Sequence, residues 1–199
     1  MKKLLILLFL ILISFNSYGL FEKTVCVETD TQDRDGIIYL PNETKPFTGK
    51  NLCKYENGQI KSEANYIDGK IEGKKTWWYD TGDIRSEANY KDDKLMGETK
   101  YFYYDIGQIE SKKNYKDKLS NGKSTFWYKN GQKFIDSNYK DKKPDGKWTF
   151  WHRNGQKDEE RNYKDGDLVD KTIFKYGYFT GHLKSKKKYK DGKCISGDC

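Results

Sequence analysis

The sequence is short of leucine, isoleucine and valine, the residues that fill the centre of a compact domain. Hydrophobic residues make up 35% of the chain and aromatic residues 16%, so aromatic rings supply nearly half of the apolar content, while charged residues reach 34%. A chain of this composition buries little apolar surface and is typically disordered unless a regular pattern organises its rings. An ordinary globular core is therefore excluded, and the fold has to come from a repeated pattern.

Residues suited to catalysis or metal binding are also scarce. The two histidines are His152 and His182, and there is no nucleophile elbow, phosphate-binding loop or zinc spacing. His152 stands where the repeats described below carry tyrosine, which favours a packing role. The segment Asp165–Asp170, "DGDLVD", follows the spacing of a calcium loop only in part. We therefore expect no enzymatic activity, no metal site and no cofactor.

Only the N-terminus carries a long apolar run. Lys2 and Lys3 precede Leu4–Phe15, "LLILLFLILISF", and the small residues Ser17 and Gly19 follow. The run is shorter than the roughly 20 apolar residues of a membrane span and is typical of a secretory signal. We predict that residues 1–19 are a signal peptide, with an uncleaved anchor as the alternative. No cysteine directly follows the run, which argues against a lipid-anchored protein.

The four cysteines are Cys26, Cys53, Cys194 and Cys199, and all lie beyond the predicted signal. An even number of cysteines in an exported chain predicts disulfide bonds, here with three possible pairings. We favour Cys26–Cys53 with Cys194–Cys199, because these pairs would fasten each end of the chain locally. The spacing, with no histidine nearby, argues against a metal site.

A repeat of about 24 residues runs through the rest of the chain. The segment Thr125–Asp141, "TFWYKNGQKFIDSNYKD", returns at Thr149–Asp165 as "TFWHRNGQKDEERNYKD". Glycines of a recurring turn lie at Gly58, Gly82, Gly107, Gly131 and Gly155, with a weaker match at Gly181, and a tyrosine follows each of them eight positions later. These tyrosines are Tyr66, Tyr90, Tyr115, Tyr139, Tyr163 and Tyr189.

Each repeat predicts a β-hairpin. "QIKSEANY", residues 59–66, alternates with period two, as expected of a strand with one half-buried face. Asp and Gly residues then mark a turn, "KKTWWY" has the composition of a second strand, and Asn-Gly is typical of tight hairpins. We predict a cap and partial first repeat at residues 20–54, tandem hairpins at 55–193 and a cysteine-bounded tail at 194–199.

Equivalent aromatic residues should form rows across successive hairpins. When the units are aligned on the turn glycine, Trp78, Tyr103, Trp127 and Trp151 make one row, which we regard as the candidate binding surface. Two rows fall on the opposite face, namely Trp77, Phe102, Phe126 and Phe150, and Tyr79, Tyr104, Tyr128 and His152. We expect rings of neighbouring units to stack and hold the array together, because one hairpin cannot stand alone.

From Asp35 to Gly192 the chain resembles the bacterial MORN-variant repeat family, whose units read approximately "YxNGxxxxExxYKDGKxxGxWxxWYxNG". The resemblance implies an all-β fold, an elongated single-layer antiparallel sheet of tandem hairpins without catalytic machinery. It also implies an antitoxin-like or immunity role, as in many bacterial members. Asp93 and Lys118 depart from the pattern where glycine is usual, and the last unit is disturbed around Ile173–Gly181, "IFKYGYFTG".

These observations lead to two expectations for function. The net charge of +8 favours anionic partners, although the lysines are spread along every repeat. We expect an exported bacterial protein, periplasmic, cell-surface or secreted, that binds another protein along its extended surface. The alternative is attachment to cell-wall glycan or an anionic membrane surface through the aromatic row and lysines. Export argues against a nucleic-acid partner, although aromatic rings between lysines can stack on bases.

Overall fold

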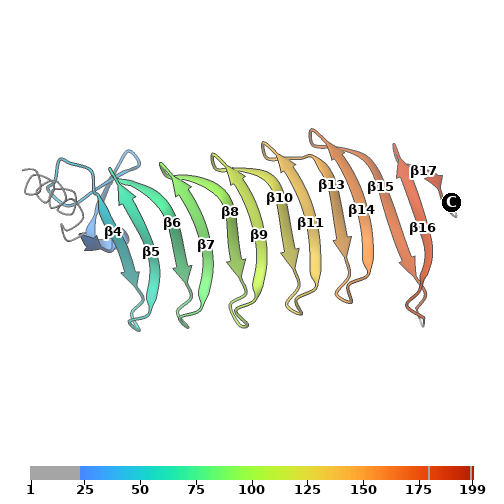
Figure 1. Cartoon of the computed structure of the whole chain (residues 1–199), viewed down its shortest axis with the longest axis horizontal. Coiled ribbons are helices and arrows are strands. Elements are labelled where there is room, and N and C mark those ends of the chain that lie inside the picture. The colour runs from blue at the N-terminus through green and yellow to red at the C-terminus, as the bar shows by residue number, and fades with distance from the viewer. Residues whose placement is uncertain (1–22, 179, 198) are drawn as a thin grey trace, which may run out of the picture.

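The computed structural model describes residues 23–178, 180–197 and 199, and within them the chain forms one long row of strands (Figure 1). The main sheet has fifteen strands in this part of the chain, and consecutive strands are neighbours along almost its whole length. Its strands are β1 (Thr24–Val25), β4 (Gly49–Lys54), β5 (Ile60–Ile67), β6 (Lys70–Trp78), β7 (Ile84–Lys91), β8 (Lys94–Phe102), β9 (Ile109–Lys116), β10 (Leu119–Trp127), β11 (Lys133–Lys140), β12 (Lys143–Pro144), β13 (Gly146–Trp151), β14 (Lys157–Lys164), β15 (Asp167–Tyr176), β16 (Leu183–Lys190) and β17 (Lys193–Ser196).

The predicted fold class is confirmed. From β4 onward every pairing in the main sheet is antiparallel, and only β1 joins β4 in parallel. The N-terminal region adds a small second sheet of β2 (Gln32–Arg34) and β3 (Ile37–Tyr39), together with α2 (Val27–Asp30), a single helical turn that the sequence pattern did not indicate. The predicted signal peptide, residues 1–19, lies outside the described residues.

The tight two-residue turns lie at the Asp-Gly pairs and their equivalents. Asp68 and Gly69 both have positive φ, 49° and 77°, as the twist-matched hairpin turn requires. Asp93 and Lys118, which replace glycine in later units, adopt the same left-handed conformation with φ of 60° and 68°. The turn geometry is therefore kept although the favoured residue is missing.

The Asn-Gly turns are longer than the tight hairpin turns that the sequence suggested. In the first, the Tyr55 N–H donates to Gln59 O at 2.8 Å and the Gly58 N–H donates to Tyr55 O at 2.9 Å. The side chain of Asn57 accepts from the Gln59 N–H at 3.0 Å and donates to Asp80 O of the next unit at 2.8 Å. The asparagine therefore shapes its own turn and also links it to its neighbour.

A second glycine in each of the first four units lets the longer strand bend, and Asp170 takes its place in the fifth. Along β5 and β6, Asn65 pairs with Glu72 and Glu63 pairs with Thr76, so β6 accommodates two extra residues beside Ala64. Gly73 lies in this bulge with φ of 80°, a conformation that strains any residue with a Cβ atom. The bulge recurs at Gly97, where Asn89 pairs with Met96 and Glu87 with Lys100.

The largest apolar cluster seals the N-terminal end of the sheet. Phe47, Ala64 and Tyr66 are buried, and side chains of the cap pack against them, including Val25, Val27, Ile38 and Leu40. Cys53 is bonded to Cys26, and Cys194 to Cys199, which are the two pairings that the sequence favoured.

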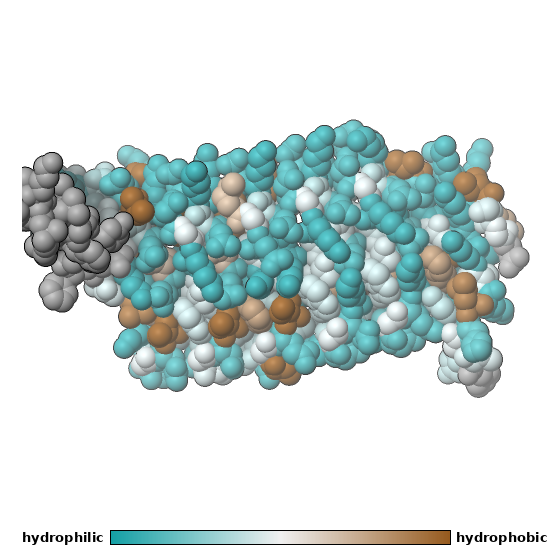
Figure 2. Space-filling view, viewed as in Figure 1, coloured by the Kyte–Doolittle hydropathy of each residue, from teal (hydrophilic) through white to brown (hydrophobic). Residues whose placement is uncertain are grey.

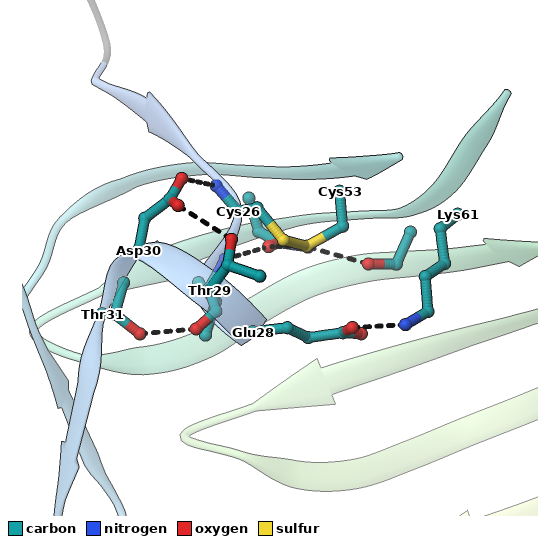
Figure 3. Close-up of a disulfide and its surroundings, with 10 residues drawn as sticks. Cys26, Glu28, Thr29, Asp30, Thr31, Cys53 and Lys61 are labelled. Atoms are coloured by element: carbon teal, nitrogen blue, oxygen red, sulfur yellow. Dashed lines mark hydrogen bonds and ion pairs between the residues drawn. A yellow bond between two sulfur atoms is a disulfide. The ribbon is translucent and has the colours of Figure 1, made fainter. Parts of the chain in front are cut away.

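Around the first disulfide, the single turn of α2 is fixed at both ends (Figure 3). The carboxylate of Asp30 accepts from the Cys26 N–H at 2.8 Å and from the Thr29 hydroxyl at 2.8 Å, and these hydrogen bonds lower the pKa of Asp30. Glu28 forms an ion pair with Lys61 of β5. The cap is thus joined to the first full hairpin by a covalent bond, an ion pair and apolar packing.

Candidate functional site

The register and the alternation of side chains define two faces of the sheet. One face carries the repeated tyrosines from Tyr66 to Tyr189 together with Trp77, Tyr101, Phe126 and Phe150, and we call it the packed face. The ladder face is the opposite one and carries Trp78, Phe102, Trp127 and Trp151. The cap contacts Ala64, Tyr66 and Ile71, all on the packed face. None of the ladder residues belongs to the apolar cluster that the cap forms with the described part of the sheet.

Rings on the packed face are separated by side chains from the strand between them. Equivalent residues of successive hairpins lie two strands apart, about 10 Å, which is too far for direct contact. The Lys113 ammonium lies between the rings of Tyr101 and Phe126, at 4.9 and 5.1 Å from their centroids. The expected stacking of each ring on its equivalent is therefore wrong for Tyr101 and Phe126. It is confirmed for Tyr79 and Tyr104 at the turns, whose ring centroids lie 4.8 Å apart in an edge-to-face arrangement.

Direct ring contacts on this face join neighbouring strands. Trp148 lies 5.1 Å from Tyr139 on one side and 5.1 Å from Tyr163 on the other, between ring centroids. Its indole N–H donates to Asn138 O at 3.0 Å. Aromatic contacts do hold units together here, but through different positions of the repeat.

A hollow of about 270 Å³ opens on the packed face between Trp77 and Tyr101. Ala88 lines it, at the position where the next unit carries Lys113, so the space between these two rings lacks a side chain to fill it. Thr99 also lines the hollow, and its buried Oγ1 has no hydrogen-bond partner in the part of the chain that the structure describes.

The structure corrects one member of the candidate row on the ladder face. Trp78 pairs with Ile84, Trp127 with Lys133 and Trp151 with Lys157, and in the third unit the equivalent pair is Phe102 with Ile109. Tyr103 therefore belongs to the turn. That unit is one residue longer, and the extra residue is taken up in the loop between β8 and β9, so counting back from the turn glycine shifts the strand by one position.

Tyr103 instead joins a row of tyrosines that tie each turn to the next hairpin. The hydroxyl groups of Tyr55, Tyr79, Tyr103 and Tyr128 donate to the carbonyl oxygens of Trp78, Phe102, Trp127 and Trp151, at 2.7, 2.8, 2.6 and 2.9 Å. These carbonyls belong to the ladder residues, so the tyrosine row fixes the backbone of the ladder. Tyr104 is displaced from the row, with 52% of its surface exposed.

The corrected ladder changes character along its length. All four ladder side chains are half-buried. The strand partners of Trp78 and Phe102 are isoleucines, whereas those of Trp127 and Trp151 are lysines. The Lys133 ammonium lies 5.7 Å from the Trp151 ring centroid. Figure 2 shows hydrophobic side chains gathered over the turn ends of the first hairpins, and a hydrophilic surface over most of the remainder.

Beside the ladder runs a row of ion pairs. Glu87 pairs with Lys74, Asp136 with Lys123 at 3.6 Å and with Lys133 at 2.9 Å. Partial burial acts to raise the pKa of Asp136, but hydrogen bonds from Thr125 and Lys133 outweigh it and hold the pKa below its usual value. Exposed pairs of this kind contribute little stability. Their effect is to set the local charge along the ladder.

The histidines and the acidic loop show no grouping suited to catalysis or metal binding. His152 occupies the tyrosine row, with Nε2 3.4 Å from Asp158 of its own hairpin. Asp170 accepts from the Asn162 side chain at 2.7 Å, so the "DGDLVD" segment is an ordinary hairpin turn and strand. Among the described residues, no three His, Cys, Asp or Glu side chains are placed to hold a metal ion, and no helix has the length and apolarity to cross a membrane.

The repeat matches a known family. The MORN repeat variant family matches residues 47–68, 71–92, 120–141 and 144–165. The chain is a MORN repeat protein. The gap in the match, residues 93–119, contains the unit with the longer turn. It also contains Asp93 and Lys118, which stand where the repeat pattern has glycine. In this MORN repeat protein the structure nevertheless continues the sheet through that unit without a break.

Comparison with other proteins adds little beyond the repeat. No curated protein matches the chain. Among solved structures it is similar to a chain described as "Crystal structure of GtfA/B complex bound to UDP and GlcNAc", at 9% identity and a TM-score of 0.24, over 74% of this chain. The MORN repeat protein spans 27% of the length of that chain.

Two features of the ladder were missed by sequence reasoning. The first is Phe102, and the second is the residue beside each rung, Ile84, Ile109, Lys133 or Lys157. The second glycine of the unit contained the signal for Phe102. Trp78, Phe102, Trp127 and Trp151 each lie five residues after such a glycine, namely Gly73, Gly97, Gly122 and Gly146. The strand after each turn contained the signal for the neighbouring residues, because Ile84 and Ser86 recur as Ile109 and Ser111.

Proposed function

We propose that this MORN repeat protein is an exported, non-enzymatic scaffold that binds another protein along its ladder face. The observation that carries the proposal is the continuous row of half-buried aromatic side chains on the face opposite the apolar cluster of the cap. Aromatic residues are enriched at protein interfaces, because they bury a large apolar area and lose little side-chain conformational entropy. An immunity or antitoxin-like role is one version of this function, in which the partner is a toxin.

Export supports the same proposal. The two disulfides are of the kind that persists in oxidising compartments, and Cys26–Cys53 joins the cap to the sheet. The predicted signal peptide agrees with such a compartment.

The test is capture of a partner from the cell envelope of the source organism. The intact protein should recover one protein reproducibly, and the variant with Trp78→Ala and Trp127→Ala should lose it. Tyr104→Ala is the matched control, because Tyr104 is an exposed aromatic outside the ladder. Failure of the intact, folded protein to recover any partner would exclude the proposal, and equal capture by the double variant would exclude the ladder.

A second candidate function is attachment to cell-wall glycan or to an anionic phospholipid surface. The hollow on the packed face supports the glycan version, since the rings of Trp77 and Tyr101 and the hydroxyls of Ser86 and Thr99 line it together. The net charge of +8 supports the lipid version. Sedimentation with purified cell wall or anionic vesicles tests both. High salt should abolish vesicle binding but spare sugar stacking. A protein that stays in solution in every mixture has neither function.

A further inference from the structure

We infer that the ladder face binds an extended segment of its partner in the polyproline II conformation, with apolar residues toward β6–β9 and acidic residues toward β13–β14. This inference rests on the proposed protein-binding function and names the chemistry of the partner. It follows from three independent properties of the ladder, namely its spacing, its free hydrogen-bond donors and its charge.

The spacing of the ladder selects among peptide conformations. Successive rungs are two strands apart, about 9.6 Å. A polyproline II chain rises about 3.1 Å per residue and repeats its face every three residues, or about 9.3 Å. Over the three steps of the ladder, the accumulated mismatch between peptide repeat and rung spacing is therefore about 1 Å. Seven residues of a helix advance about 10.5 Å and drift by nearly 3 Å. An extended strand repeats its face every ~6.7 Å and falls out of phase at the first step. Polyproline II therefore fits best.

The ladder also offers donors that the protein itself leaves unused. Within the described residues, the indole N–H groups of Trp78, Trp127 and Trp151 make no hydrogen bond, whereas that of Trp148 on the packed face is paired with Asn138 O. A polyproline II chain has no internal hydrogen bonds, and its carbonyl oxygens are free to accept. Aromatic surfaces that combine ring contact with such donors are a known mode of recognising this conformation.

Charge gives the bound segment a direction along the ladder. Near Trp78, Glu87 is matched by one lysine, Lys74. Farther along, Asp136 is shared by Lys123 and Lys133, and Glu160 in the same way by Lys147 and Lys157, each at 2.8 Å. Each of these later carboxylates is thus surrounded by two positive charges. Carboxylates of a partner would relieve this excess, while the isoleucine end would accept proline or leucine.

The experiment uses synthetic peptides of about twelve residues, or four turns of polyproline II, measured by calorimetry on the full protein. The first peptide is proline-rich, with leucine at every third position and aspartates at one end. The second has the same composition with leucines at every second position. We expect the first to bind at least about tenfold more tightly, because only its apolar residues meet successive rungs.

Substitutions identify the donors and the charge. Trp127→Phe keeps the ring and removes the N–H, and should weaken the first peptide by about 2- to 12-fold, the range for one hydrogen bond. Trp127→Ala should weaken it by about 30-fold or more, as expected of an interface hot spot. Lys133→Gln should weaken binding of the first peptide at low salt, and should have little effect on that binding at high salt. Tyr104→Ala, outside the ladder, should leave the affinity unchanged.

The inference is overturned if the first peptide does not bind at about 1 mM, if both peptides bind equally, or if Trp127→Phe and Trp127→Ala both leave binding unchanged. Denaturant unfolding of each variant establishes that it is folded, and Lys133→Gln tests the ladder without changing a ring. Capture of an envelope protein whose bound segment is helical or a β-strand would overturn this inference while leaving the proposed function intact. The two failures are therefore distinguishable.

Discussion

At the scale of single residues, the tight turns hold side chains in a conformation that suits glycine. Lys118 has φ of 68°, and its N–H donates to Leu95 O at 3.1 Å, a bond that glycine would keep. The left-handed conformation costs a side-chain residue about 1–2 kcal/mol, and glycine's extra freedom in the unfolded chain costs about 0.4–1 kcal/mol. We expect Lys118→Gly to stabilise the protein by roughly 0.5–1 kcal/mol in urea unfolding. Lys116→Gly, two residues earlier in β9, should lower the free energy of unfolding. If both glycine variants were less stable than the original protein, this account would be refuted.

Buried tyrosines make the packed face sensitive to alkaline pH. Burial raises the pKa of Tyr66 to about 12, with Asp93 adding to the effect, and burial likewise raises the pKa of Tyr115 to about 12, with Tyr101 contributing. In the unfolded chain these phenols ionise near pH 10. The unfolded state therefore loses its protons first, and stability should fall as pH rises from about 10 through 12. Stability measured across this range should fall less steeply in Tyr66→Phe than in the original protein. Equal slopes would contradict the assignment.

At the scale of the hairpin, a tyrosine hydroxyl at each of four successive turns joins that turn to the next hairpin, and His152 takes this position at the fifth turn. Tyr79 donates to Phe102 O at 2.8 Å, and Tyr79→Phe removes only that bond. We expect a loss of about 1 kcal/mol, together with faster amide exchange at the β8–β9 turn. Tyr104→Phe should cost far less, because the Tyr104 hydroxyl contacts Asp80 at the surface, at 3.2 Å. Equal losses in the two variants would show that the tyrosine row is not what couples the turns.

The hairpins themselves could be predicted because their signals are local. Period-two alternation in Ile60–Tyr66 and the Asp-Gly pair at Gly69 each act within a few residues. The position of Phe102 in the ladder was misread because one extra residue in the third unit can be placed in the strand or in the turn. Counting back from the turn glycine places it in the strand, whereas the spacing from Gly97 and the pairing of β8 with β9 place it in the turn. The Asn-Gly turn was misread for a related reason, since Asn57 bonds to the neighbouring unit.

At the scale of the whole molecule, the sheet is a linear array whose ends need protection. Cys26–Cys53 closes 27 residues and Cys194–Cys199 closes 5. Loop-closure entropy then predicts a loss of about 3.5 kcal/mol for replacing the first pair with serine and about 2 kcal/mol for the second. In an array, each loss should be local. Hydrogen exchange should show faster opening of β4–β5 after the first replacement and of β16–β17 after the second. Uniform loss of protection along the sheet would instead indicate a single cooperative unit.

The sequence by itself determined a row of antiparallel hairpins, the positions of their turns and an end-fastening pair of disulfides. The hairpins and turns depend on residues close together in the chain, and the disulfides on the even number of cysteines and their placement near the two ends. The tertiary structure alone decided which face the cap covers, and that Lys113 rather than another ring separates Tyr101 from Phe126. Those contacts join residues from different strands, often a whole repeat apart. Their alignment is set by strand register and packing, which no local pattern encodes.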